Sequence, residues 1–345
     1  MFGGTSKLGL DIGSRYIKGV ELSEEGEDSY KLTGYGVTKI DPELDPAQNI
    51  ERFREQHSFS TTMVSTAVSG RAVIIRYVNM PEGEEDQLDS QLSEQASKYI
   101  PFEIEDAIID YERLPQEEQS PVTSDDEMRV LIVAAKEQLV NEHADTVERA
   151  GYKPQAVGID ALALGNAFDF FLTNNREEHQ GQIVGLVDIG AEKSLVHIMD
   201  QDQSQFAREF DMGGDEFTQS IATRKGISNQ EAEELKVGGD DADQDEIAEL
   251  VQDKIDDLCH EIPLSFDFFE TQFDKEVDQI YVSGGGSFIR GLDTVMEDVF
   301  DLEPTFWDPF KNLDVDLEVG SLDQLQDATR FLPVATGLAW RGLEE

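Results

Sequence analysis

Over the first 75 residues, apolar residues come in short runs separated by polar turns, which is typical of β-strands. Four such runs are predicted to be strands, and an amphipathic segment before the last of them is predicted to be a helix. The strands cover residues 8–12, 16–23, 31–39 and 62–68, and the helix covers 47–57.

Residues 76–152 show a different pattern and are predicted to form a small inserted α+β subdomain. A β-rich run over 72–80 ends at Pro81, and helical spacing of apolar residues follows over 84–99. Two strands and a helix come next, and the helix ends at Gly151, a residue type favoured after helix ends. These elements cover 107–114, 128–135 and 137–150, with an acidic loop over 115–127.

The second half of the chain shows the strand-to-helix pattern again, on the scale of a whole lobe. The polar run 174–182 is predicted to be the inter-lobe linker, and Pro263 is expected to bend or break a long helix. Strands are predicted at 156–159, 183–188, 193–200, 204–210 and 279–283, and a loop at 238–244. Helices are predicted at 162–173, 214–225, 229–236, 245–273, 292–300 and 332–343, the last returning to the first lobe.

Two copies of one short motif stand between strands, Leu10-Asp11-Ile12-Gly13-Ser14 and Val187-Asp188-Ile189-Gly190-Ala191. Each predicts a hairpin whose Gly lets the backbone approach a bound group and whose turn N–H groups form an anion-binding nest. The aspartate at each strand end can hold a magnesium ion directly or through water. A single such turn is explained by turn chemistry alone, but the matched pair predicts two similar lobes closing on a nucleotide's phosphates.

Two further glycine-rich segments follow the second hairpin. Gly284-Gly285-Gly286 joins a predicted strand to Ser287, and such a turn suits close backbone approach to a ligand, with a plain strand–helix turn as the alternative. The segment matches neither the dinucleotide fingerprint GxGxxG nor the phosphate loop GxxxxGK[ST]. Gly213 and Gly214 stand at the start of a predicted helix and could approach a ligand. Glu233 and Lys236 share a face of the next helix, where they could contact a ligand, although a solvated salt bridge is the simpler interpretation.

The chain is strongly acidic, with 74 Asp and Glu against 27 Lys and Arg and a formal net charge of −47. This charge excludes nucleic acid and anionic lipid as expected direct partners. The acids are spread along the whole sequence, which favours a solvated surface adapted to high salt. Cys259, the only cysteine, lies in an apolar helical pattern and is predicted to be a core thiol. No apolar run approaches the roughly 20 residues of a membrane span, and no signal peptide is evident, so we expect a cytoplasmic protein.

In this order, the motifs resemble the actin-like ATPase superfamily over essentially the whole chain. DIGSRYIK is similar to its first phosphate loop, VDIGAEKS to its second and YVSGGGS to its adenosine-binding turn, while 157–166 and 333–339 resemble its two connecting helices. Within the superfamily, the chain resembles the PilM family of type IV pilus assembly proteins, with FtsA as the nearest relative. That resemblance rests on Arg76 to Pro81 (RYVNMP), Lys98 to Phe102 (KYIPF) and Ile109-Asp110-Tyr111.

The resemblance implies a fold of duplicated ribonuclease H-like lobes with an inserted α+β subdomain, and ATP with Mg²⁺ as ligands. It implies a first-lobe subdomain over 1–75, completed by 153–180 and 331–345, an inserted subdomain over 76–152 and a second lobe over 181–330. Metal ligation falls to Asp11 and Asp188. Phosphate, ribose or base contacts fall to Asp11, Gly13, Ser14, Arg15, Lys18, Gly190, Ala191, Gly213, Gly214, Glu233, Lys236, Gly285, Gly286 and Ser287.

Catalysis is less well supported than binding. The second loop reads Ala191-Glu192-Lys193, where strong ATPases carry further Gly and Thr donors. A residue must also position the attacking water, and Asp160 is the one candidate, with helix N-capping as an equally good explanation. We therefore expect slow hydrolysis at most.

The PilM resemblance implies a cytoplasmic scaffold, peripheral to the inner membrane, that binds the N-terminal peptide of a PilN-like single-pass protein. The expected groove lies between the first and inserted subdomains, with strands 107–114 and 128–135 as candidate edges. Self-association is left open. One alternative is an FtsA-like division filament, but such a protein is expected to end in a membrane helix, and none follows Arg341 in this sequence. The other alternative is a sugar or acetate kinase, for which no catalytic base acting on a substrate is evident.

Overall fold

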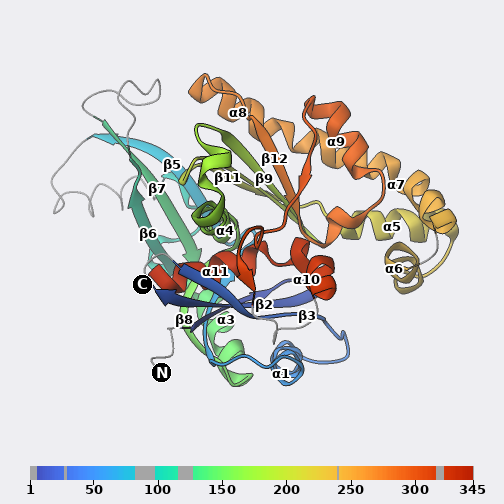
Figure 1. Cartoon of the computed structure of the whole chain (residues 1–345), viewed down its shortest axis with the longest axis horizontal. Coiled ribbons are helices and arrows are strands. Elements are labelled where there is room, and N and C mark those ends of the chain that lie inside the picture. Colours follow the sequence, from blue (N-terminus) through green and yellow to red (C-terminus); the bar gives the residue numbers. More distant parts are fainter. Residues whose placement is uncertain are drawn as a thin grey trace.

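The computed structural model describes residues 6–26, 29–81, 98–115, 127–238, 241–315 and 322–344. Two mixed sheets form the centres of two lobes, and a third, antiparallel sheet stands beside them (Figure 1). The first sheet has the order β14-β3-β2-β1-β4-β8, the second β11-β10-β9-β12-β13 and the third β5-β7-β6.

The bounds of the predicted strands agree with the structure to within a few residues, whereas the two-residue strands β13 and β14 were not predicted. The first sheet contains β1 (Ser6–Ile12), β2 (Tyr16–Gly26), β3 (Ser29–Lys39), β4 (Met63–Val68), β8 (Lys153–Ile159) and β14 (Asp314–Val315). The second contains β9 (Ile183–Ile189), β10 (Ser194–Asp200), β11 (Gln203–Phe210), β12 (Gln279–Ser283) and β13 (Thr305–Phe306). The third contains β5 (Val73–Pro81), β6 (Ala107–Arg113) and β7 (Glu127–Lys136).

The two lobes share one strand arrangement, as the paired motifs predicted. In the first lobe β1 runs antiparallel to β2 and parallel to β4. In the second lobe β9 runs antiparallel to β10 and parallel to β12. Each DxG turn therefore stands at the end of a central strand.

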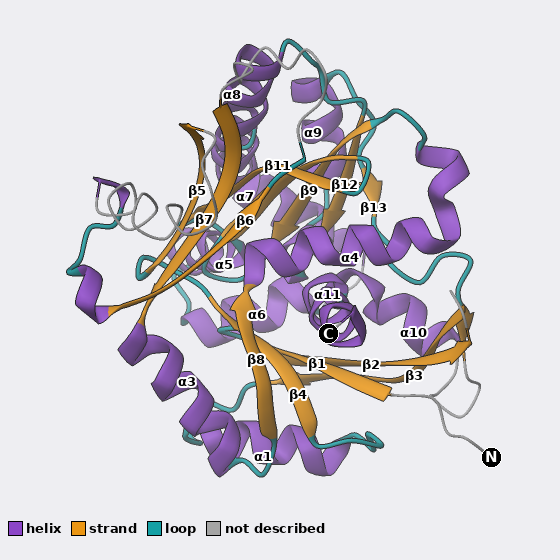
Figure 2. Cartoon of the chain, turned by 90° about the vertical axis from the view of Figure 1, so that its left-hand side faces the viewer, coloured by secondary structure: helices purple, strands orange, loops and turns teal. Residues whose placement is uncertain are grey.

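The helices cover the sheets and connect the lobes. They are α1 (Pro46–Gln56), α3 (Glu137–Arg149), α4 (Asp160–Asn175), α5 (Gly214–Lys225), α6 (Asn229–Val237), α7 (Asp241–Glu261), α8 (Pro263–Phe273), α9 (Leu292–Phe300), α10 (Leu322–Ala328) and α11 (Pro333–Glu344). Helices α4 and α11 lie side by side between the lobes (Figure 2). The last helix therefore returns to the first lobe as predicted. Within the described residues, no helix is both long and apolar enough to cross a bilayer.

Several boundaries differ from the predictions. Helix α7 begins at Asp241, inside the segment predicted as a loop over 238–244, whereas the break at Pro263 is confirmed. The predicted linker 174–182 contains a short 3₁₀ helix, Arg176–His179, with His179 buried. Its ring bonds Tyr281 Oη at 2.7 Å, so this connection is packed rather than open. Most of the predicted helix 84–99 and loop 115–127 lies outside the described residues.

Helix α3 packs on the first-lobe sheet rather than on the inserted one. Its Val147, with the adjoining Ala150, shares a core with Leu8 and Leu10 of β1 and Phe53 of α1. The domain boundaries given above stay a prediction, and this packing favours an inserted unit that ends with β7.

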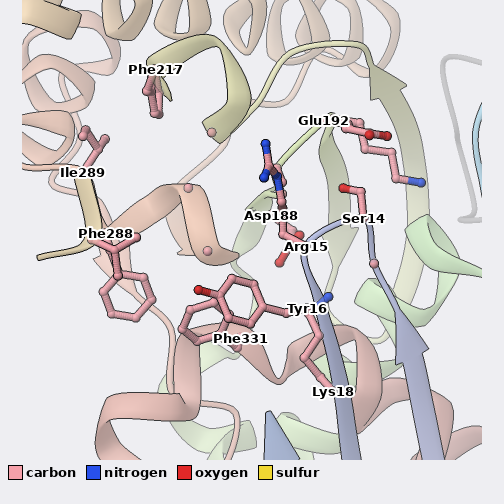
Figure 3. A pocket seen from close by; sticks show the side chains of 18 of the residues that line it. Ser14, Arg15, Tyr16, Lys18, Asp188, Glu192, Phe217, Phe288, Ile289 and Phe331 are labelled. Carbon is pink, nitrogen blue, oxygen red and sulfur yellow. The ribbon is translucent and has the colours of Figure 1, made fainter. Parts of the chain in front are cut away.

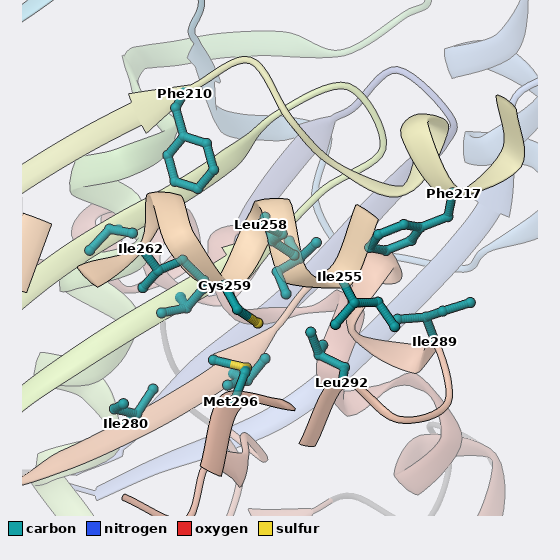
Figure 4. Packing of buried hydrophobic residues seen from close by; sticks show 14 of the residues in the cluster. Phe210, Phe217, Ile255, Leu258, Cys259, Ile262, Ile280, Ile289, Leu292 and Met296 are labelled. Atoms are coloured by element: carbon teal, nitrogen blue, oxygen red, sulfur yellow. The ribbon is translucent and has the colours of Figure 1, made fainter. Parts of the chain in front are cut away.

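Cys259 on α7 is fully buried in the second-lobe core, as predicted (Figure 4). Burial raises the pKa of its thiol to about 12. Because the thiolate is the reactive form, we expect almost no reaction with a disulfide reagent at pH 8 in the native protein and rapid reaction in denaturant. Absorbance of the released thiol measures both rates, and equal rates would contradict this burial.

Candidate functional site

A cavity of about 540 Å³ lies between the two lobes, at the ends of β1 and β9 (Figure 3). Residues from both DxG turns, from α5 and α6 and from the triple-glycine segment line it. Of the residues predicted for binding, catalysis or metal ligation, those that line it are Asp11, Gly13, Ser14, Arg15, Lys18, Asp160, Asp188, Gly190, Ala191, Gly214, Glu233, Lys236, Gly285 and Gly286.

The two DxG turns have the same hydrogen bond. Gly13 N–H donates to the carbonyl of Tyr16 at 3.1 Å, and Gly190 N–H donates to that of Lys193 at 2.9 Å. These two amides, predicted to face phosphate, are therefore engaged inside their turns. Within the described part of the chain, the next two amides of each turn have no protein acceptor, those of Ser14 and Arg15 and those of Ala191 and Glu192. These tip amides are the donors available to an anion.

The two motif aspartates differ in exposure and in their partners: Asp11 is buried and Asp188 is half-buried. Asp11 Oδ2 forms an ion pair with Lys18 Nζ at 2.8 Å, and Asp188 Oδ2 accepts a hydrogen bond from Ser283 Oγ at 2.8 Å. Burial raises the pKa of both carboxyls, that of Asp188 to about 6, although Lys18 acts in the opposite direction. Carboxylate oxygens suit Mg²⁺, and a cation would compensate for their burial.

No group of three or more His, Cys, Asp or Glu side chains within the described ranges forms a ready metal site. The donor chemistry therefore fits a metal that these two aspartates share with a bound ligand or water.

Asp160, the predicted catalytic candidate, is the first residue of α4. The N-cap residue is Ile159, without a side-chain capping bond, so the capping interpretation is wrong. The Asp160 carboxylate instead pairs with Lys193 Nζ at 3.1 Å, and Lys193 also contacts Glu209 at 3.1 Å and Ser69 Oγ. The lysine in the second loop thus holds the carboxylate that was predicted to position water.

Glu233 is buried and pairs with the half-buried Lys236, so the pair is not the solvated salt bridge of the simpler interpretation. Their charged atoms lie 2.7 Å apart, and Thr218 Oγ1 also donates to Glu233. Burial acts to raise the pKa of Glu233, but Lys236 and these hydrogen bonds lower it below the ordinary value. Lys236 Nζ further donates to the carbonyl of Gly214 at 3.0 Å, which fixes α6 against the start of α5.

Two predicted site residues stand behind the cavity wall. A Cβ on Gly213 would lie 2.7 Å from the carbonyl oxygens of Gly190 and Ala191, so this glycine permits close packing against the second turn. Ser287 is buried and its Oγ donates to the carbonyl of Gly284 at 2.7 Å. Both residues support the walls rather than face the cavity.

The sequence model of the type IV pilus assembly protein PilM matches residues 9–343. The chain belongs to the PilM family. A solved structure titled "PilM-PilN type IV pilus biogenesis complex" is 26% identical, with a TM-score of 0.84, and the match covers 98% of this chain and 99% of that one. The ethanolamine utilization protein EutJ from Carboxydothermus hydrogenoformans, 14% identical, matches with a TM-score of 0.54 over 97% of this chain and 89% of its own. The predicted actin-like fold with a PilM-type inserted subdomain is confirmed.

In this PilM-family chain, aromatic residues that the motif analysis missed form one side of the cavity (Figure 3). The ring of Phe331 stacks on Phe288 with centroids 5.1 Å apart and lies 5.2 Å from Tyr16. In the sequence, Tyr16 comes just after the first turn and Phe288 just after the glycine-rich segment. This closeness to the motifs was the only sign in the sequence that the two residues belong to the site. Flat aromatic faces of this kind suit a planar ring.

An ion pair beside the cavity links the first turn to the second lobe. Arg15 in the first turn contacts Asp215 on α5 through Nε at 3.0 Å and Nη2 at 2.9 Å. Arg15 was predicted to contribute its backbone amide, and its side chain in addition links the two lobes.

Proposed function

We propose that this PilM-family chain binds ATP with Mg²⁺ between its lobes and serves as a scaffold in type IV pilus assembly. The observation that carries the nucleotide proposal is the pair of matching turns. They face one cavity with four open amides and an aspartate behind each turn, Asp11 buried and Asp188 half-buried. Such a nest of N–H donors together with carboxylates is what a metal-bound polyphosphate needs.

The residues divide the cavity into a charged and an aromatic part. Phosphates would take the tip amides and Lys18, the metal would take Asp188 and Asp11, and the bound Mg²⁺ would neutralise phosphate charge. The ribose and base would lie toward Glu233, Lys236, Gly285 and Gly286, beside the aromatic rings. The test is a titration with a fluorescent ATP analogue, in Mg²⁺ and in EDTA, where saturable Mg²⁺-dependent binding supports the proposal and its lack overturns it.

We propose that ATP acts here as a structural or switching ligand with slow hydrolysis at most. The candidate for positioning water, Asp160, is held by Lys193, which Glu209 and Ser69 also hold. Lys193 engages Oδ2 of this carboxylate, which leaves Oδ1 as the acceptor that could position a water molecule. The Arg15–Asp215 ion pair gives the nucleotide a way to influence how the lobes meet.

The partner proposed for the scaffold is a PilN-like membrane protein, bound through its N-terminal peptide, which would hold the chain at the inner membrane. Support comes from family membership and from the related PilM–PilN structure. The edge strands of the inserted sheet are β5 and β6. The prediction that strand 128–135 is an edge is wrong, because this strand, β7, lies at the centre of the sheet. On the edge strand β6, Ile108 is 45% exposed and Tyr111 is 38% exposed.

The β6 edge gives a direct test of the peptide proposal. Replacing Ile108 by lysine should weaken capture of the partner's synthetic N-terminal peptide at least about tenfold, because a charge replaces an apolar contact. Fluorescence anisotropy measures the affinity. The matched control is Val299→Lys on α9, a residue also exposed by 39% but in the second lobe. Equal affinity of Ile108→Lys and the control would place the peptide elsewhere.

A further inference from the structure

A second cavity, of about 690 Å³, lies between the inserted sheet and the second lobe. It is bordered by β5 and β11, the outermost strands of their respective sheets (Figure 2). No strand ladder joins β5 to β11 in the described residues. Side chains join them instead. Tyr77 Oη bonds Ser204 Oγ at 2.5 Å at one end, and Glu209 accepts from Gly70 N–H at 3.2 Å at the other.

The order of these contacts shows that the two strands run antiparallel. Tyr77, at the middle of β5, meets Ser204, early in β11, while Gly70, before β5, meets Glu209, late in β11. Between the contacts, the edges of two sheets face one another across a cavity. Unused main-chain groups on such edges are the donors and acceptors that an extended segment uses to join a sheet.

Arg129 on β7 is the unusual residue of this cavity. It is only 7% exposed, and among the described residues no carboxylate pairs with it. Its guanidinium donates to the side chain and the carbonyl of Gln205 and lies over the rings of Tyr77 and Phe273 at 5.2 and 4.6 Å. Burial lowers its pKa to about 10. Two of five N–H donors are thus engaged, and a buried cation without an anion is costly.

The charge of the lining is opposite to that of the chain. Four arginines line the cavity, Arg71, Arg76, Arg129 and Arg208, against two acids, Glu209 and Asp211. Over the whole sequence, acids outnumber bases 74 to 27. Asp211 is paired with Arg71 and Glu209 with Lys193, so neither acid neutralises Arg129. Arg208 is paired with Glu261 outside the lining, so Arg76 and Arg129 are the lining arginines for which the described residues offer no acidic partner. An anionic ligand is the complement of this lining.

The rim is apolar and open. Phe268 on α8 is 54% exposed, and its ring lies 5.2 Å from that of Phe206 on β11. Exposed aromatic rings beside a strand edge suit the alternate side chains of a bound extended segment, whereas they would leave a small solute largely in water.

We propose that this cavity binds an extended acidic segment of a partner protein, whose Asp or Glu side chain pairs with Arg129 while its backbone lies along β5 and β11. This site goes beyond the PilN-type peptide proposed for β6, which is the opposite edge of the inserted sheet. It also lies apart from the nucleotide cavity, so it is testable without nucleotide.

The test uses the full chain and two mixtures of labelled heptapeptides with β-branched or aromatic flanks. One mixture has glutamate fixed at the centre, and the other has glutamine. Wild type should retain the glutamate mixture at least tenfold better than the glutamine mixture. Arg129→Gln should abolish this preference, Arg129→Lys should keep part of it, and Arg224→Gln, which removes an arginine paired with Asp253 outside the cavity, should keep all of it.

Melting temperatures show whether each variant folds. The comparison of the two peptide mixtures on the wild type remains informative even if Arg129→Gln does not fold. No preference for glutamate in the wild type would overturn the proposal, as would a preference that survives Arg129→Gln in a folded protein. A third arm uses free glutarate. Arg129-dependent binding of glutarate with retention of neither peptide mixture would assign the site to a small carboxylate and reject the partner segment.

Discussion

Asp188→Ala is expected to weaken Mg-ATP binding at least about tenfold, a change of roughly 1.4 kcal/mol. Asp188 is half-buried behind the second turn, and its Oδ2 accepts one hydroxyl hydrogen bond. Asp11 already has the ammonium of Lys18 at 2.8 Å. The carboxylate that most needs a cation is therefore Asp188, and removing it should remove a metal contact that Lys18 cannot replace.

The titration with a fluorescent ATP analogue separates metal binding from general damage. Wild type and variant should differ in Mg²⁺ and converge in EDTA, because the lost contact passes through the metal. The matched control is Asp200→Ala, which removes a β10 aspartate paired with Lys275 away from the cavity. Equal affinities of Asp188→Ala and wild type in Mg²⁺ would mean that the paired turns are not a metal–phosphate site.

The features of this site that were predictable from sequence are the local ones. Asp11 and Gly13 are two residues apart, and a DxG turn between apolar runs forces them to one strand end whatever surrounds it. The same holds for Asp188 and Gly190. The hydrophobic periods likewise predicted most strand and helix bounds, since alternation and helical spacing depend on near neighbours.

The features that escaped prediction depend on residues far apart in the chain. Asp160 is the first residue of α4 rather than its N-cap, and its partner Lys193 comes from the second DxG hairpin, far along the chain. The Arg15–Asp215 pair and the Phe288–Phe331 stack likewise need the lobes assembled. Strand order is a tertiary property too, which is why β7 was predicted as a strand but not as the centre of its sheet.

Gly337→Val is expected to destabilise the whole molecule by about 3 kcal/mol or more, because overpacking a tight contact forces backbone shifts. Helix α11 crosses α4 at this glycine, and a Cβ there would lie 1.8 Å from the carbonyl oxygen of Ala163 and 2.7 Å from Ala167 N. Both groups are backbone of α4 and cannot rotate away. On its other side α11 meets β1 with equal closeness, since a Cβ on Gly9 would lie 2.0 Å from the carbonyl of Ala335.

Urea unfolding followed by circular dichroism measures this effect. Gly26→Ala is the control, because a Cβ at Gly26 meets nothing within 4 Å, and it should change the free energy of unfolding by less than about 1 kcal/mol. If Gly337→Val unfolds at the same urea concentration as the wild type, the backbones of α4 and α11 are not in direct contact at Gly337. Because α4 begins at Asp160 on the nucleotide cavity and α11 packs between it and β1, that contact fixes how far apart the two turns stand. A partly folded Gly337→Val protein should therefore lose Mg-ATP binding together with stability, whereas Asp188→Ala should lose the binding alone.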